Sequence, residues 1–362
     1  MQLIVLGMHR SGTSTLTRLL NMAGAYFGPE GISNGADEGN LKGFWERVDV
    51  RAACDGLLQE SGLDWWKVAD FSLDRISEET RARHVGSVRR IFLELDAHRP
   101  WVVKEPRLSL LFPLVRPLLE LPVCIHVNRE PLEIADSLQT RNGFPAPAGL
   151  ALWELYTIHA LEGSTGLPRL LVHYEDLMSD PVDTFARVVG QLNDLGVVGL
   201  RVPTAREITA YIDPGLHREH RSSADRRMWM NEQQMSLAAG IDDGTVIDGA
   251  AVPHNVSQGA AAQLLAFEED RARQNEIKGL QNQIDALGAT AKGHLMRADR
   301  QLQLLSRSRT WRVASGADAA RRRLLGEDEA SASDALGRTI SIIDRARREL
   351  GELSARPDDG RA

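Results

Sequence analysis

The first 24 residues constrain the fold more than any other part of the chain. Gln2-Leu-Ile-Val-Leu6 is a nearly continuous apolar run, and residues 15–23 have helical character and end at Gly24. Between them lies the loop Gly7-Met-His-Arg-Ser-Gly-Thr-Ser14. A strand that is apolar throughout must be covered on both faces. A glycine-bounded turn from such a strand into a helix directs backbone N–H groups at an anion, aided by the helix dipole. The segment therefore predicts a phosphate-binding loop.

Three later apolar runs repeat the pattern of a buried strand followed by a helix. The strands are expected at 101–104, 122–127 and 169–173, and helices at 77–97, from Pro131 onward and at 182–193. Strands that alternate with helices favour an α/β fold with a mostly parallel sheet. Ligands of such sheets bind at the carboxyl ends of the strands. We therefore expect a three-layer P-loop fold, with a helical extension at the C-terminus.

Composition excludes several classes of protein. The 362 residues include only two cysteines, Cys54 and Cys124, which argues against a secreted chain held by disulfides. Residues 1–260 carry 25 basic and 34 acidic side chains, and such an acidic body argues against nucleic-acid binding. We expect no signal peptide and no membrane span, because no apolar stretch approaches about 20 residues. The expected location is cytoplasmic, with contact at the inner face of the membrane as an option.

The C-terminal third changes character. We expect the first domain at 1–235, a linker at 236–262, a helical segment at 263–305, a basic segment at 306–326 and a helix with a polar tail at 327–362. Apolar residues of the helical segment follow a heptad spacing, which suits self-association through a coiled coil and equally suits packing on the body. The basic segment holds six arginines and one aspartate, so it suits either an anionic membrane surface or a packed helix.

The loop departs from the nucleoside-triphosphatase pattern at one position. Thr13 stands where that pattern has a lysine, and the loop carries its positive charge at Arg10 instead. Without the lysine, transfer of a terminal phosphoryl group lacks its usual cation. The loop still predicts an anion site, which the backbone amides and hydroxyls of Ser11, Gly12, Thr13 and Ser14 would form.

Arg10-Ser-Gly-Thr-Ser14 resembles the 5′-phosphosulfate loop of sulfotransferases that use 3′-phosphoadenosine 5′-phosphosulfate (PAPS). That family binds the 3′-phosphate of the cofactor with an arginine after a strand and a serine eight residues later. Arg129 and Ser137 match that second motif. The resemblance covers about residues 1–235. It implies PAPS as cofactor, 3′,5′-adenosine bisphosphate as product, and no metal.

Three further segments share the resemblance. Residues 101–107 resemble the strand end of bacterial carbohydrate sulfotransferases, residues 40–46 the segment that carries the catalytic carboxylate, and residues 170–177 the late strand. Many members have lysine where this chain has Arg10. The implied catalytic residues are Arg10 for charge on the bridging oxygen, Glu46 as base and Lys104 on the sulfonate.

Several more residues have roles that the sequence leaves open. Asp37, Glu38 and His9 are reserve candidates for the base, and Arg107 either orients the acceptor or pairs with a carboxylate. Arg218 and Arg221 are candidate contacts to the nucleotide. The favoured function is sulfuryl transfer to a sugar hydroxyl of a bacterial cell-surface glycan or glycolipid. A P-loop kinase and a non-catalytic assembly protein are the competing functions.

Overall fold

The computed structural model describes residues 1–35, 43–212, 221, 225–247, 252–325 and 332–353. Its sheet has the four strands expected from the apolar runs: β1 (Gln2–Leu6), β2 (Trp101–Lys104), β3 (Pro122–Asn128) and β4 (Arg169–His173). Their order is β2-β1-β3-β4, and every neighbouring pair is parallel. The predicted parallel α/β sheet is confirmed.

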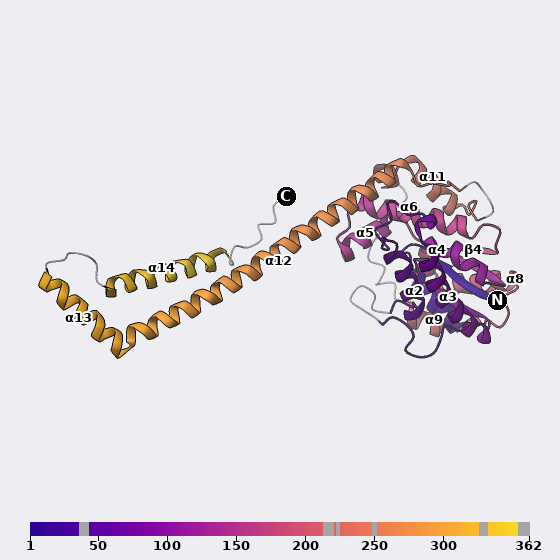
Figure 1. Cartoon of the computed structure of the whole chain (residues 1–362). Helices are drawn as coiled ribbons and strands as arrows, with labels where there is room; N and C mark the ends of the chain where they lie inside the picture. Colours follow the sequence, from indigo (N-terminus) through magenta and orange to yellow (C-terminus); the bar gives the residue numbers. More distant parts are fainter. Residues whose placement is uncertain (36–42, 213–220, 222–224, 248–251, 326–331, 354–362) are drawn as a thin grey trace. The chain divides into compact units, whose positions relative to one another are not determined.

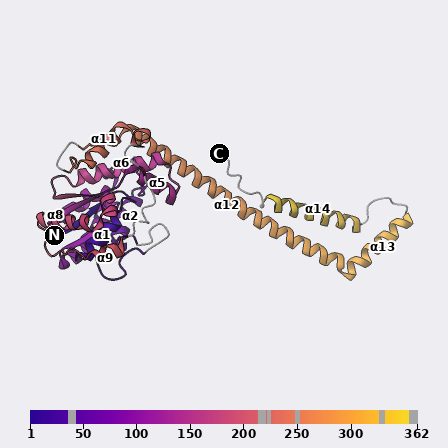
Figure 2. The same ribbon diagram turned by 180° about the vertical axis from the view of Figure 1, so that it is seen from behind.

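Helices cover both faces of this sheet (Figures 1 and 2). Alternate side chains of β1 point to opposite faces, so Leu3 and Val5 enter one core while Ile4 and Leu6 enter the other. The Leu3 face is packed by α1 (Thr13–Met22), α7 (Tyr174–Ser179), α8 (Pro181–Asp194) and α9 (Ala205–Tyr211). The Ile4 face is packed by α2 (Val48–Gln59), α3 (Glu78–Leu95), α4 (Leu108–Val115), α5 (Pro131–Asn142) and α6 (Ala146–Gly163). The domain therefore has three layers.

Local signals explain where several of the expected helices begin and end. Helix α3 starts after Ser77, whose hydroxyl accepts a hydrogen bond from the Thr80 N–H at 3.2 Å. Helix α5 starts with Pro131 and ends at Gly143, whose φ of 67° is a left-handed cap. Helix α1 begins at Thr13, two residues earlier than expected, because Gly12 already serves as its N-cap.

The chain divides into two compact units, Met1–Glu269 and Asp270–Ala362. The first unit extends past residue 235 and includes α10 (Arg226–Trp229) and α11 (Glu232–Asp242). Helix α11 and the start of α12 (Gln258–Arg307) occupy part of the expected linker. Ser257, which directly precedes α12, contacts the first unit: its N–H and its hydroxyl donate to buried Glu154 of α6, at 2.6 and 2.9 Å.

The C-terminal unit is helical. Helix α12 spans the predicted helical segment, α13 (Arg309–Leu325) covers most of the basic segment, and α14 (Ala332–Leu353) matches the last expected helix. Within the described residues, no helix combines the length and the hydropathy that crossing a bilayer requires.

The strand order decides which residues meet at the edge where ligands bind. Strand β1 lies between β2 and β3, so the loop after Leu6 is flanked by the end of β2 at Lys104 and the end of β3 at Asn128. Residues about a hundred positions apart in the sequence are therefore neighbours. The carboxyl ends of these three strands form the candidate site.

Candidate active site

The loop from Gly7 to Thr13 has a backbone that glycine makes possible. Gly12 has a φ of 90°, and a Cβ atom there would lie 2.2 Å from the ring of Tyr174. A side chain at this position is therefore excluded by both backbone conformation and space. Ser109 supports the loop from α4: its hydroxyl accepts from the Gly7 N–H at 3.0 Å and donates to the Gly7 carbonyl at 3.2 Å. These contacts hold the loop against the sheet.

Helix α1 begins from this loop without a side-chain cap in the described structure. The first N–H groups of an α-helix have no partner within the helix, and its N-terminus carries partial positive charge. The first turn of α1 can therefore receive an anion. The Thr13 hydroxyl is an additional donor there, whereas the Ser14 hydroxyl donates to the Phe44 carbonyl at 2.6 Å.

Two non-glycine residues within the described ranges have a left-handed backbone, Arg10 with a φ of 73° and Trp45 with a φ of 48°. Such conformations cost of order 1–3 kcal/mol each, and they concentrate at active and ligand-binding sites. Arg10 lies in the loop itself, and Trp45 directly precedes Glu46. Both strained positions therefore flank residues that the sequence analysis assigned to the site.

The two predicted cofactor motifs meet in space. The Arg10 Nε donates to the Ser137 hydroxyl at 3.0 Å, and an Nη of Arg129 donates to the Arg10 carbonyl at 3.2 Å. Arg129 is 5% exposed, donates from its Nε to Glu133 at 2.9 Å, and lies over the ring of Tyr174 at 5.0 Å. The loop after β1 and the helix after β3 thus form one arginine-rich cluster.

Arg221 joins this cluster from a distant part of the chain. Its backbone N–H donates to Glu133 at 3.1 Å, and its side chain pairs with Asp136 at 2.7 Å. Both acidic residues belong to α5, the helix that carries Ser137. Arg218, the second candidate nucleotide contact, lies outside the described residues.

Lys104 and Glu46 form a buried ion pair beside the loop. The Lys104 Nζ lies 2.6 Å from Glu46 Oε1, and the two residues are 1% and 6% exposed. The same ammonium group donates to the Phe44 carbonyl at 2.6 Å and to the Ser14 hydroxyl at 3.1 Å. All three protons of the lysine are thereby used. The three contacts bring a base candidate, a cation and the anion-binding loop within one hydrogen-bond network.

Arg107 is engaged by carboxylates. It pairs with Glu105 and with Asp55, each at 2.6 Å, and it is almost fully buried. Burial raises the pKa of Glu105, and the negative charge of Glu46 raises it further. Of the two interpretations of Arg107 that the sequence left open, its geometry matches the paired one. Its charge offsets the buried carboxylates and supports the end of β2.

His9, a reserve candidate for the base, packs among aromatic rings. Its ring centroid is 4.6 Å from that of Trp65 and 5.8 Å from that of Tyr156. Burial lowers its pKa well below the usual value, and the charges of Arg107 and Lys104 lower it further. The imidazole is therefore neutral at neutral pH. The carboxylates Asp37 and Glu38, also candidates for the base, lie outside the described residues.

An aromatic group beside the loop is a feature that the sequence analysis did not single out. Trp65 stacks on Phe144 with centroids 5.4 Å apart, and Trp66 and Phe144 both contact Phe267 from the start of α12. The adjacent tryptophans at 65 and 66 were the available signal. Phe144 comes from the segment after α5. Because Trp65 contacts both Phe144 and His9, the aromatic group lies next to the anion-binding loop.

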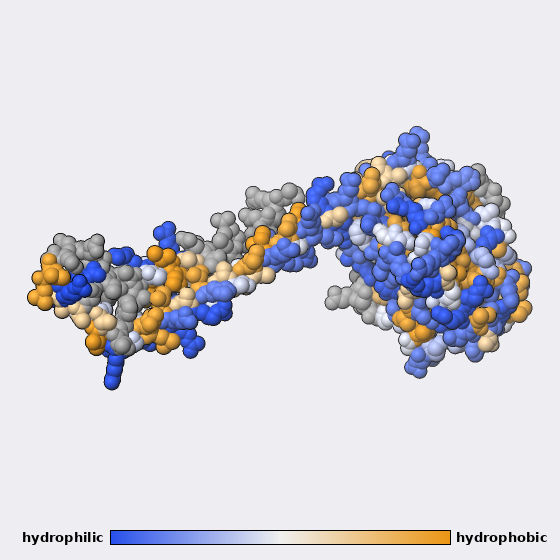
Figure 3. Space-filling view, viewed as in Figure 1, coloured by the Kyte–Doolittle hydropathy of each residue, from blue (hydrophilic) through white to orange (hydrophobic). Residues whose placement is uncertain are grey.

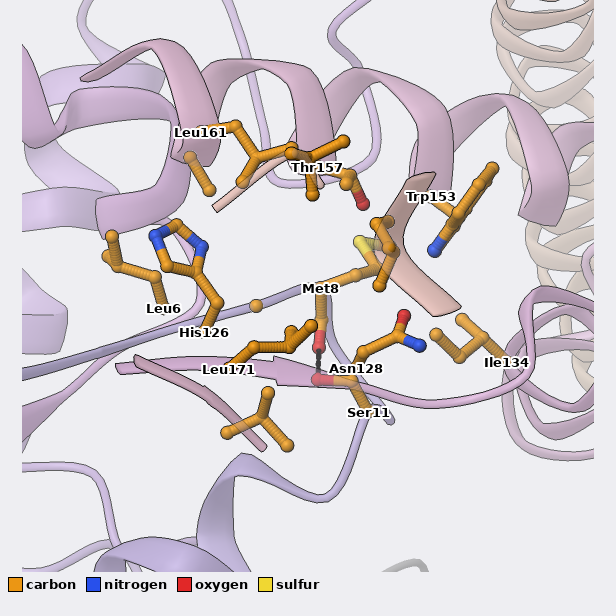
Figure 4. A pocket seen from close by; sticks show the side chains of 15 residues that line it. Leu6, Met8, Ser11, His126, Asn128, Ile134, Trp153, Thr157, Leu161 and Leu171 are labelled. Carbon is orange, nitrogen blue, oxygen red and sulfur yellow. Dashed lines mark hydrogen bonds between the residues drawn. The ribbon is translucent and has the colours of Figure 1, made fainter. Parts of the chain in front are cut away.

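A small cavity lies between the loop and α6 (Figure 4). Met8 and Ser11 line it from the loop, and Trp153 and Thr157 line it from α6. The Ser11 hydroxyl donates to the Met8 carbonyl at 2.7 Å, drawn as the dashed line. The cavity volume of about 30 Å³ holds only about two water molecules. It is too small for a nucleotide or a sugar ring.

Similarity to known proteins is found only among solved structures. No protein-family model and no curated protein matches the chain. Among the described residues, no group of three or more histidine, cysteine or acidic side chains is placed to hold a metal ion.

Several solved structures are similar to the chain, among them the following three. The sulfotransferase domain of the Synechococcus PCC 7002 olefin synthase is 18% identical, with a TM-score of 0.36, over 74% of this chain and 94% of that one. The sulfotransferase domain from the curacin biosynthetic pathway is 14% identical, with a TM-score of 0.34, over 73% and 97%. Sulfotransferase STF9 from Mycobacterium avium is 17% identical, with a TM-score of 0.37, over 67% and 76%.

Proposed function

We propose that this protein transfers a sulfuryl group from PAPS to a hydroxyl of a sugar, in a cell-surface glycan or glycolipid. The observation that carries the proposal is the meeting of the two cofactor motifs. Arg10 of the loop contacts Ser137 at 3.0 Å and Arg129 at 3.2 Å, although these partners are more than a hundred residues away in sequence. A cofactor with phosphate groups at both its 5′ and 3′ positions needs two cationic anion sites next to each other.

The residues at the site fit such a cofactor. The backbone amides of Gly12, Thr13 and Ser14 and the Thr13 hydroxyl would hold the 5′-phosphate at the start of α1. The Ser11 and Ser14 hydroxyls donate to the Met8 and Phe44 carbonyls in this structure and would have to rotate to join them. Arg129, Ser137 and Arg221 would hold the 3′-phosphate, and they lie in one cluster on α5 and its neighbours. Gly12 lets the loop backbone pack directly against the Tyr174 ring, where a Cβ atom would clash.

Catalysis then requires a cation at the leaving oxygen and a base for the acceptor hydroxyl. PAPS supplies an activated sulfuryl group when it is bound. Arg10 lies in the loop that would hold the 5′-phosphate, so its guanidinium can offset charge that develops on the bridging oxygen. Glu46 accepts the proton of the acceptor hydroxyl, and Lys104 offsets the charge of that carboxylate from 2.6 Å before the transfer.

The acceptor side is assigned to the aromatic group beside the loop. Trp65 and Trp66 are partly exposed, and Trp65 packs against His9 of the loop. Phe144 is buried beneath them, 1% exposed, and supports both indole rings. Binding sites for small organic ligands combine apolar and aromatic walls with a few polar groups that fix orientation. A sugar, which has apolar C–H faces and hydroxyl edges, suits such a wall.

Ligand-dependent thermal shift tests the cofactor. Stabilisation by 3′,5′-adenosine bisphosphate and none by ATP with Mg²⁺ is the expected result, because a ligand that binds only the folded state raises its stability. Stabilisation by ATP with Mg²⁺ alone would replace the proposal with a kinase. No response to either nucleotide would favour a non-catalytic role. Transfer of labelled sulfate from PAPS to a panel of glycans then tests the acceptor class.

A further inference from the structure

Helix α12 carries an exposed apolar stripe. Ile277, Leu280, Ile284 and Leu287 follow one another at spacings of three and four residues, so they lie on one side of the helix. They are 61%, 53%, 61% and 71% exposed, respectively. Figure 3 shows apolar surface along these C-terminal helices. We call these four residues the α12 stripe.

No other described segment of the chain covers the helix around the stripe. Every residue from 272 to 287 is exposed, whereas further along α12 a few positions are partly covered and Asp299 is only 8% exposed. Most helical stability in proteins comes from packing an amphipathic face, and Gly279 weakens this part of the helix further. A helix of this length with an apolar stripe therefore requires a partner surface.

The residue types on the α12 stripe favour a second copy of the same helix as the partner. In a heptad written with Ile277 at position a, both isoleucines occupy a and both leucines occupy d. β-Branched residues at a with leucine at d favour parallel pairing of two helices. The only charged residue flanking this seam at e or g, between 276 and 288, is Glu276, and position e of a second copy facing it is Gln281. Two copies therefore meet without like charges in contact.

A lipid surface suits this stripe less well. Residues 272–287 contain two basic and two acidic side chains, so the segment has no net charge. Helices that lie on membranes have a cationic polar face and a wide apolar face. The narrow, neutral α12 stripe lacks both properties.

We propose that the α12 stripes of two copies of this chain pair in parallel and in register, as a two-stranded coiled coil. The seam spans two heptads, which is short for a coiled coil, so the dimer forms and dissociates with concentration. This inference does not depend on the reaction proposed above.

Sedimentation equilibrium of the full chain tests the association. The mass is expected to rise with protein concentration from 40.0 kDa toward twice that value. Ile284→Glu should hold the protein at the monomer mass throughout. Leu304→Glu is the matched control, because Leu304 is an equally exposed leucine on the same helix outside the stripe, at 64%. A monomer at every concentration, a trimer, or equal loss of the dimer in the control would overturn the proposal.

Disulfide trapping tests the orientation. Both native cysteines, Cys54 and Cys124, are buried, so a thiol introduced on the stripe is the accessible one. Ile277→Cys should form a disulfide-linked dimer that separates only when a reductant is added. Position 277 faces position 277 of the second copy only in a parallel, in-register pair. A mixture of the Ile277→Cys and Leu287→Cys proteins should yield few mixed dimers. Mixed dimers as the main product would show an antiparallel pair and refute the parallel register.

Discussion

Replacement of Arg129 by alanine should weaken cofactor binding at the arginine cluster. A charge-assisted contact to a phosphate is worth about 2–4 kcal/mol when one partner is truncated in a buried setting. At 1.4 kcal/mol per tenfold, the Kd for 3′,5′-adenosine bisphosphate should rise roughly 30- to 700-fold. Isothermal titration calorimetry on the full chain measures this change directly.

The same substitution has a second cost, which the structure locates. Glu133 is 3% exposed and accepts from Arg129 at 2.9 Å, so alanine leaves a buried carboxylate without this partner. Breaking a buried ion pair from one side costs about 3–5 kcal/mol of folding stability. The double variant Arg129→Ala with Glu133→Gln removes the uncompensated charge. It should recover part of that stability in urea unfolding and still bind the nucleotide weakly.

Arg99→Ala is the matched control for both measurements. Arg99 pairs with Asp96 at 2.9 Å, and Asp96 also accepts from Gln2 and Trp101, which begin β1 and β2. This ion pair therefore lies at the opposite edge of the sheet, and its loss should leave nucleotide affinity unchanged. Wild-type affinity in both Arg129 variants would refute the assignment of Arg129 to the 3′-phosphate.

Three further changes have defined outcomes. Glu46→Gln should retain nucleotide binding and lower kcat by roughly 10²- to 10⁴-fold, as loss of a general base does. His126→Asn should reduce the acid sensitivity of folding: burial, with a contribution from Arg169, lowers the pKa of His126 to about 3. In the unfolded chain this histidine binds a proton below its ordinary pKa of about 6.5, whereas in the folded protein it stays neutral. As the pH falls from 6.5 to 3, His126 therefore lowers the folding stability by about 1.4 kcal/mol per pH unit. Replacing the six arginines of residues 306–326 by glutamine should abolish co-sedimentation with anionic vesicles at low salt, since each contributes about 1 kcal/mol.

Each of these changes has a control. Glu30→Gln, at an exposed carboxylate, should leave kcat unchanged, and full activity of Glu46→Gln would remove Glu46 as the base. Above pH 7 the imidazole of His126 is neutral in both the folded and the unfolded state, so there the variant and the wild type should have the same pH slope of stability; an unchanged slope below pH 6 in His126→Asn would contradict the argument. If the wild-type protein stays in the supernatant with anionic vesicles at low salt, the basic segment has no membrane role.

The amino-acid sequence determined the parts of the fold that depend on short-range pattern. Apolar runs predicted all four strands. Strands β1, β2 and β3 are buried on both faces and are therefore apolar at almost every position, whereas alternate residues of β4 are partly exposed. Gly7 and Gly12 marked the loop, because the backbone there takes conformations that glycine adopts readily. By contrast, α6 was not predicted, since it is buried on almost every side and shows no helical alternation of apolar and polar residues.

The pairing of charges at the site depended on tertiary structure. The sequence placed Lys104 and Arg107 at the end of one strand, assigned Lys104 to the sulfonate, and left Arg107 open between the acceptor and a carboxylate partner. The fold pairs Lys104 with Glu46 and pairs Arg107 with Glu105 and Asp55. Which carboxylate reaches which cation is decided by the order of the strands and the packing of α2 beside them. A buried charge must find its partner in space, and spacing along the chain carries no information about distances between separate elements.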